Sequence, residues 1–297
     1  MNQLISIQDL NIAEVEEIFT LAKKLKKQQK KGKAKQLLKG KTLAMIFNKP
    51  SVRTRVSFDV AMSQMGGHSI YMADDIQFGK RESVADIART LSRYVDGIMI
   101  RTFDHQNVVD LAWHASVPVI NGLTDYLHPC QALTDIFSVR EKLGQLDKVK
   151  LAYIGDGNNV AGSLINLAAI LNLDLHIASP HEYQPEPEII HNAKTVHIWK
   201  DPVDAVKDAD VVYTDTWTSM GQEDEAEKRA KAFAAFQLNR ELLDNAKPNA
   251  LVMHCLPAHR GMEITDEVID SPQSIVFDQA ENRLHVQKAI LVLLMNK

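Results

Sequence analysis

Cysteine is scarce in this sequence. Among 297 residues only Cys130 and Cys255 occur, and two thiols in separate loops do not make the disulfide framework that stabilises small secreted domains. No spacing of cysteine and histidine resembles that of a zinc site. We therefore expect two reduced thiols and no bound metal.

Long apolar runs and an excess of positive charge are also missing. No run approaches the roughly 18–20 apolar residues of a membrane span, and residues 1–20 lack the basic start and apolar block of a signal peptide. The formal net charge is -4, whereas binding to a nucleic-acid backbone usually needs a net basic face. These absences predict a cytoplasmic protein with neither membrane nor nucleic acid as a partner.

The sequence does contain apolar residues in a regular α/β alternation. At 45% hydrophobic composition, the chain has material for two domains of roughly 100–150 residues each. Helical spacing of apolar residues begins at Ile12, and the lysine-rich segment 23–35 that follows is predicted to be a solvated helix face. The predicted strands cover 42–47, 68–72, 97–101 and 117–121, then 149–154, 174–178, 195–199, 211–214, 251–254 and 274–277.

This alternation predicts the α/β class, with two doubly wound parallel-sheet domains. Helix 132–143 would join the two domains, and a C-terminal helix at 280–295 would pack back on the first. The expected division is residues 1–135 with 280–297 for one domain and 136–279 for the other. The charged segment 222–231 is predicted to be a solvated helix, with a closing lid as the alternative.

One loop has the composition of a phosphate site. Residues 51–55, Ser-Val-Arg-Thr-Arg, connect a predicted strand to a predicted helix. A helix start that carries hydroxyls, free amide N–H groups and arginines suits a phosphate. Arg101, at the end of another predicted strand, would add a guanidinium, and His128 a hydrogen-bond donor. The alternative is an ordinary N-capped helix with surface arginines.

Three further loops follow apolar, β-rich runs. Residues 128–131 read His-Pro-Cys-Gln, and residues 254–257 read His-Cys-Leu-Pro. In open α/β folds the ligand crevice lies at the carboxyl ends of the strands. Residues 155–159, Gly-Asp-Gly-Asn-Asn, suggest a dinucleotide fingerprint, but Val160 replaces its third glycine. We interpret this loop as a turn that presents Asn159 to a ligand.

With these loops in view, the chain resembles the aspartate/ornithine carbamoyltransferase family over nearly its full length. Ser51-x-Arg53-Thr54-Arg55 resembles the carbamoyl-phosphate signature of the family, with Val52 as the one departure, and His128-Pro129-x-Gln131 its second motif. The ornithine branch is marked by an aspartate before Ser-Met-Gly, here Asp215 and residues 219–221, and by His-Cys-Leu-Pro. Residues 281–283, Glu-Asn-Arg, also fit the family.

The resemblance implies transfer of a carbamoyl group from carbamoyl phosphate to L-ornithine without cofactor or metal, in a homotrimer with shared active sites. It implies catalytic roles for Cys255, Arg101, His128 and Arg283. The residues implied for carbamoyl phosphate are Ser51, Val52, Arg53, Thr54, Gln77, Arg101, His128, Gln131, Cys255, Leu256 and Arg283, with Gln77 donated by a neighbouring subunit. Those implied for ornithine are Asn159, Asp215, Ser219 and Met220.

Several alternatives stay open at this point. The amine could be putrescine or N-acetylornithine, although the Ser-Met-Gly loop favours ornithine over putrescine. A protein that binds carbamoyl phosphate without turnover would keep the same first loop. Cys255 could be a buried structural thiol, as lone cysteines often are. A covalent mechanism through Cys255 is disfavoured, because the amine is itself the nucleophile.

Overall fold

The computed structural model describes residues 1–73, 76, 82–191 and 193–296. The chain divides into two compact units, one formed by Met1–Thr134 with Asn282–Lys297 and the other by Asp135–Glu281. Each unit holds one parallel β-sheet. No helix among the described residues is long and apolar enough to span a bilayer.

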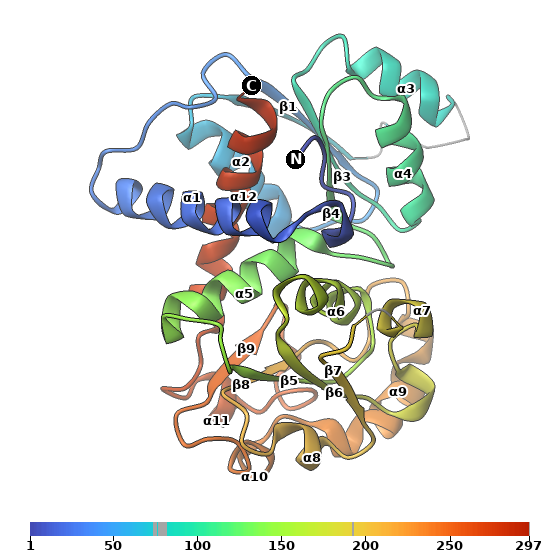
Figure 1. Ribbon diagram of the computed structural model, residues 1–297. Helices are drawn as coiled ribbons and strands as arrows, with labels where there is room; N and C mark the ends of the chain where they lie inside the picture. Colours follow the sequence, from blue (N-terminus) through green and yellow to red (C-terminus); the bar gives the residue numbers. More distant parts are fainter. Residues whose placement is uncertain (74–75, 77–81, 192, 297) are drawn as a thin grey trace. The chain divides into compact units, whose positions relative to one another are not determined.

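The first unit is built on a four-stranded sheet in the order β2-β1-β3-β4 (Figure 1). Helices α3 and α4 cover one face of this sheet, and α1, α2 and the end of α12 lie on the other. Gly97 in β3 lets α12 approach, since a Cβ there would meet the Met295 sulfur at 3.1 Å. The bounds are β1 Thr42–Phe47, β2 His68–Met72, β3 Gly97–Arg101, β4 Val119–Leu123, α1 Ile12–Lys30, α2 Val52–Gln64, α3 Val84–Leu91 and α4 His105–His114.

The second unit is built on a five-stranded sheet in the order β7-β6-β5-β8-β9. Helix α6 covers one face, and its residues 160–168 are buried and mostly apolar. The opposite face packs on a core that includes Val212, Trp217 and Phe233. The bounds are β5 Lys150–Ile154, β6 Asp174–Ala178, β7 Val196–Trp199, β8 Val211–Thr214, β9 Leu251–His254, α6 Asn159–Leu171, α7 Pro187–Ile190, α8 Pro202–Val206, α9 Ala226–Phe233, α10 Arg240–Leu243 and α11 Asp266–Ile269.

Two helices contain residues of both units. Helix α5, Pro129–Leu143, begins in the first unit and ends in the second, and α12, Val276–Met295, begins in the second and ends in the first. The predicted α/β class with two parallel sheets, a joining helix and a C-terminal helix on the first unit is confirmed.

One predicted strand is wrong. Residues 274–277 do not form a strand, because α12 already begins at Val276 and only Ser274 makes an isolated bridge, to Val252. The apolar triplet at 275–277 is short enough to fit either a strand or a helix start. Its helical continuation over the next 18 residues decides for the helix.

Candidate active site

Residues 51–55, which were predicted to bind phosphate and are called the phosphate loop below, lie where β1 ends and α2 begins, as the sequence predicted. Ser51 is the N-cap of α2, and its hydroxyl accepts a hydrogen bond from the Thr54 amide at 3.2 Å. The ordinary capping role therefore exists. It does not exclude the anion role, because the amides of the first helical turn still point past the helix end.

Thr54 is the centre of a buried polar cluster in the first unit. Its hydroxyl oxygen accepts from the Arg283 guanidinium at 2.8 Å and lies 3.5 Å from the nearer Arg101 nitrogen. Arg283 also donates to the Gln131 side-chain oxygen at 3.0 Å, and Arg101 to the Lys49 carbonyl at 3.1 Å. Four residues predicted for one site, from α2, β3, α5 and α12, thus form one hydrogen-bonded group.

His128 is buried beside this cluster. Burial lowers its pKa well below the usual 6.5, and the positive charges of Arg283, Arg101 and Lys49 lower the pKa further. The imidazole is therefore neutral at pH 7 and keeps one N–H to donate. Two buried guanidinium groups beside a neutral histidine make this region positively charged, which repels cations and favours an anion.

The other residues predicted for the first unit differ in their burial. Arg53 is half-buried, and its Nε has no hydrogen-bond partner among the described residues. Val52 is exposed. Gln77 lies outside the described residues. Cys130 is a buried thiol whose pKa is raised to about 12 by burial, so it is un-ionised at neutral pH.

Asp215 and Cys255 are brought together in the second unit. Asp215 follows β8, and its Oδ1 accepts from the Cys255 thiol at 2.6 Å and from the Thr216 amide at 2.8 Å. Its Oδ2 accepts from the Asn158 side-chain amide at 2.8 Å. Adjacent parallel strands β8 and β9 place these two predicted residues side by side at their carboxyl ends.

Asn158 was not identified from the sequence, which pointed to its neighbour Asn159. Asn158 is the N-cap of α6, and its side-chain oxygen accepts from the amides of Val160 and Ala161. The cap fixes which way the amide points, so that its NH2 faces Asp215. The preference of asparagine for N-caps was the signal that could have found it.

The loop after β9 is held by a hydrogen bond to His254, which is itself bonded to buried Glu263. Leu256 has a φ of +60°, a left-handed conformation uncommon for leucine. Its amide donates to His254 Nδ1 at 2.8 Å, so the other ring nitrogen carries the proton and donates to buried Glu263 at 3.1 Å. Cys255 and Leu256 are thereby held in place while remaining partly exposed.

The residues predicted to bind ornithine lie on different segments of the second unit. Asn159 is the first residue of α6, whereas Ser219 and Met220 lie in the loop that continues from Asp215. The Ser219 amide donates to Gln222 Oε1 at 3.2 Å, and Met220 is largely exposed. The sequence identified the loop, and its predicted contacts to a ligand stay predictions.

Helix α9 is only partly the solvated helix predicted for 222–231, since Arg229 is buried. Arg229 donates to buried Asp156 at 3.0 Å. Burial raises the pKa of Asp156 to about 6, and the attraction of Arg229 opposes this rise without cancelling it. The result is a buried ion pair next to the loops that hold Asn158 and Asp215.

We expect Asp156→Asn to change how stability depends on pH. Between the ordinary pKa of 3.8 and the raised value of about 6, the unfolded chain loses the Asp156 proton while the folded chain keeps it. The free energy of unfolding of the wild type therefore falls by about 2 kcal/mol across this window, out of about 3 kcal/mol in all, and the loss is complete near pH 7. In urea unfolding from pH 4 to 7, the free energy of unfolding of the asparagine variant should rise by about this amount relative to that of the wild type. A difference independent of pH would contradict it.

Within the described part of the chain, two groups of side chains have the composition of metal sites, namely Asp174 with His176 and His197, and Asp215 with His254 and Cys255. In the first, Trp199 donates to His176 Nδ1 at 2.8 Å, so the proton of a neutral ring sits on Nε2, facing Asp174. In the second, His254 has the same tautomer. His176 and His254 therefore offer no lone pair toward their groups without a change of hydrogen bonds.

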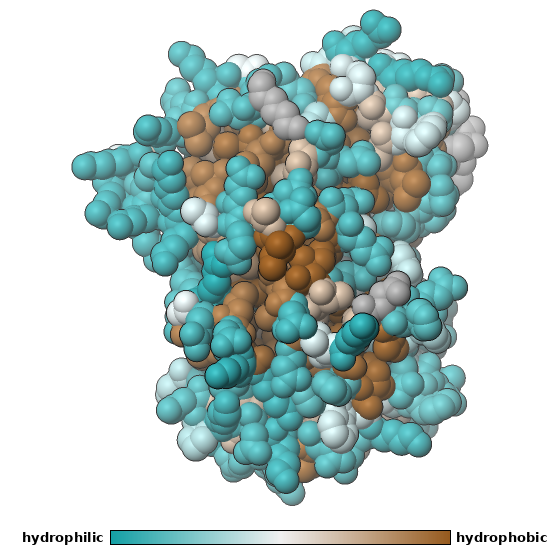
Figure 2. Space-filling model, in the orientation of Figure 1, coloured by the Kyte–Doolittle hydropathy of each residue, from teal (hydrophilic) through white to brown (hydrophobic). Residues whose placement is uncertain are grey.

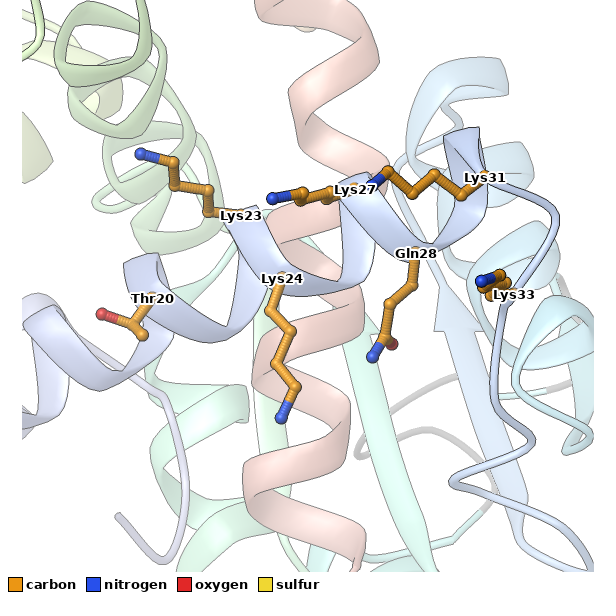
Figure 3. A pocket seen from close by; sticks show the side chains of 7 residues that line it. All are labelled: Thr20, Lys23, Lys24, Lys27, Gln28, Lys31 and Lys33. Carbon is orange, nitrogen blue, oxygen red and sulfur yellow. The ribbon is translucent and has the colours of Figure 1, made fainter.

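The lysine-rich end of α1 borders a surface groove. Figure 2 shows hydrophilic side chains at this end of the first unit, where Figure 1 places the end of α1. The groove is lined by Thr20, Lys23, Lys24, Lys27, Gln28, Lys31 and Lys33. Figure 3 shows Lys23 and Lys24 pointing to opposite sides of the helix, so these two ammonium groups diverge. This arrangement fits a solvated face better than an anion site.

Comparisons with known proteins cover nearly the whole chain. Residues 2–141 match the family described as aspartate/ornithine carbamoyltransferase, carbamoyl-P binding domain, and residues 147–294 match the Asp/Orn binding domain of the same family. The ornithine carbamoyltransferase of Pyrococcus abyssi is 55% identical over 98% of this chain and 95% of its own length. The anabolic ornithine carbamoyltransferase of Pyrococcus furiosus is also 55% identical, over 98% and 96%.

The fold agrees with solved structures as well. The ornithine carbamoyltransferase structure from Pyrococcus furiosus superimposes with a TM-score of 0.97 at 54% identity, covering 99% of this chain and 97% of that one. In sequence, the match to the second domain runs to residue 294. In space, residues 282–297 belong to the first unit.

Proposed function

Because the chain belongs to the aspartate/ornithine carbamoyltransferase family, we propose that it is an ornithine carbamoyltransferase. It transfers the carbamoyl group of carbamoyl phosphate to the δ-amine of L-ornithine and gives L-citrulline and phosphate. The observation that carries this proposal is the full-length identity of 54–55% with relatives that bear that name. The hydrogen-bonded groups around Thr54 and Asp215 support it.

In this proposal the first unit, corresponding to residues 1–135 with 280–297, binds carbamoyl phosphate. Ser51, Val52, Arg53, Thr54 and Arg101 hold the phosphate. Thr54, neutral His128 and Arg283 direct donors at the carbamoyl oxygen, which gains negative charge as the amine attacks. Gln131 accepts from the carbamoyl NH2, with help from the Leu256 carbonyl. A donor set of this kind needs no metal, since phosphate is already a good leaving group.

The second unit, corresponding to residues 136–279, binds ornithine. The δ-amine titrates near pH 10, so presenting it neutral at pH 7 costs about 4 kcal/mol. Asp215 and Cys255 orient the neutral form, while Asn159 and the Ser219-Met220 backbone hold the α-amino and α-carboxyl groups. The amine nitrogen forms a bond to the carbamoyl carbon, the carbon–oxygen bond to phosphate breaks, and the phosphate leaves with the electron pair. Asp215, which accepts a hydrogen bond from the Cys255 thiol, is the acceptor that we propose for the proton that the amine loses.

The test is an assay of citrulline formation with the purified protein, run in parallel on ornithine, putrescine, N-acetylornithine and aspartate. We expect ornithine to have the highest kcat/KM by at least about 100-fold, because the charged α-groups of the others are missing, masked or misplaced. If another amine is turned over faster, that amine is the substrate and ornithine is not. If the protein binds carbamoyl phosphate but turns over no amine, it is a carbamoyl-phosphate-binding protein and not an enzyme.

We also propose a cytoplasmic homotrimer that serves arginine biosynthesis. An anabolic relative supports the metabolic role, and the scarcity of cysteine supports the compartment. The trimer and the shared site rest on the family resemblance, with Gln77 given by a neighbouring subunit. Mixing inactive Gln77 and Arg53 variants should restore activity in mixed trimers, and mixed trimers without activity would contradict the shared site.

A further inference from the structure

Arg229 connects three segments of the second unit. From α9, its guanidinium donates to Asp156 in the β5–α6 loop and to the Trp217 carbonyl in the loop after β8, both at 3.0 Å. A third bond, at 3.1 Å, reaches Glu225 on the preceding turn. The guanidinium also lies 4.6 Å from the centre of the Tyr183 ring.

Burial makes these contacts consequential. The side chains of Arg229 and Asp156 are 7% and 9% exposed, whereas that of Glu225 is 55% exposed. A buried charge without its partner is costly, so Arg229 and Asp156 hold each other in place. The Trp217 indole stacks on Phe233, with ring centres 5.8 Å apart, so packing fixes its side chain while Arg229 fixes its carbonyl.

The two loops that Arg229 joins each carry residues proposed for ornithine. Two positions after Asp156 comes Asn158, which donates to Asp215, and then Asn159. Two positions after Trp217 comes Ser219, the start of the Ser-Met-Gly turn. Neither loop is held to the other by a sheet, since both lie past the strand ends. A rigid bridge between them sets the spacing of the groups that would read the α-amino and α-carboxyl ends.

We propose that Arg229, paired with Asp156, is a positioning residue that fixes the Trp217–Ser219 segment against the β5–α6 loop and so determines affinity for the amino-acid end of the substrate. This inference rests on the proposed function. Arg229 itself contacts no substrate. Its loss should weaken recognition of the α-groups and leave the binding of carbamoyl phosphate unchanged.

The test removes the pair as a whole. Arg229→Met alone would leave Asp156 buried and unpaired, so the main variant is Arg229→Met with Asp156→Asn. We expect its KM for ornithine to rise at least about 10-fold, the loss from one or two charge-assisted hydrogen bonds. The KM for carbamoyl phosphate should stay within about 2-fold. Arg229→Lys retains the positive charge but not the several N–H donors of the guanidinium. Its KM for ornithine should lie between those of the wild type and the double variant.

Binding of L-norvaline separates this inference from the proposed function. L-Norvaline has the α-groups of ornithine without the δ-amine, so it binds without turnover. Its dissociation constant, measured by calorimetry with saturating carbamoyl phosphate, should rise in the double variant by the same factor as the KM for ornithine. Failure of the wild type to bind L-norvaline would count against the proposed function itself.

Glu225→Gln is the matched control. Glu225 contacts the same guanidinium but is exposed, and exposed ion pairs contribute little to stability. The KM of Glu225→Gln for ornithine should therefore stay within about 2-fold of the wild-type value. A folded double variant with wild-type affinity for ornithine and L-norvaline would overturn the inference. So would an equal rise in KM for both substrates, because that would indicate a general loss of structure. If the double variant does not fold, Arg229→Lys decides by the same criteria.

Discussion

Arg53→Ala is expected to lower kcat/KM for carbamoyl phosphate by roughly 10²–10⁴-fold. The phosphate loop places Arg53 at the first turn of α2, where a phosphate dianion would need charged donors. Two charge-assisted hydrogen bonds of about 1.5–3 kcal/mol each account for that range. The Arg53 Nε has no partner among the described residues, so its loss should cost the fold little. Steady-state kinetics with saturating ornithine measure the effect.

Arg55→Ala is the matched control for Arg53. It lies two positions further along the same helix, is exposed, and stacks on Tyr71 with 3.9 Å between its guanidinium carbon and the ring centre. We expect less than about a 10-fold loss for Arg55→Ala, the contribution of one exposed cation–π contact. Equal losses for both variants, or near wild-type activity for Arg53→Ala, would show that the phosphate lies elsewhere.

The sequence predicted the fold well because local and global signals agree in it. Each sheet consists of short apolar runs between helical segments, and that alternation is specific to parallel α/β architecture. Where the local signal is ambiguous, prediction failed. The triplet 275–277 is as apolar as a strand, and only its position at the start of α12 makes it helical.

Sequence motifs pointed to residues that the structure brings together, and the roles of these residues toward a substrate stay predictions. Thr54, Arg101, Gln131 and Arg283 are dispersed over 230 residues, and the structure joins them in one hydrogen-bonded group. Contacts that support the motifs from outside could not be found in the same way. Arg229 lies in a charged segment whose composition is that of a solvated helix, and only tertiary packing buries it against Asp156.

Asp215→Asn is expected to lower kcat by about 10³-fold, as for loss of a well-placed acid–base group. Its carboxylate accepts from donors on both oxygens, namely Cys255 and Thr216 on one and Asn158 on the other. An asparagine has one acceptor and one NH2 group, so at one end two donors would face each other. The negative charge that attracts the δ-amine is lost as well.

The affinity for inorganic phosphate provides the control for Asp215→Asn, because the phosphate loop belongs to the first unit and should be unaffected. A second control is the cycle of Asp215→Asn, Cys255→Ala and the double variant. If the pair joined at 2.6 Å acts as one group on the amine, the double variant should be little worse than the poorer single variant. Strictly multiplicative losses would mean that the two residues act independently. Retention of more than about a tenth of wild-type kcat by Asp215→Asn would remove Asp215 from the reaction, since acid–base groups contribute about 10²-fold or more.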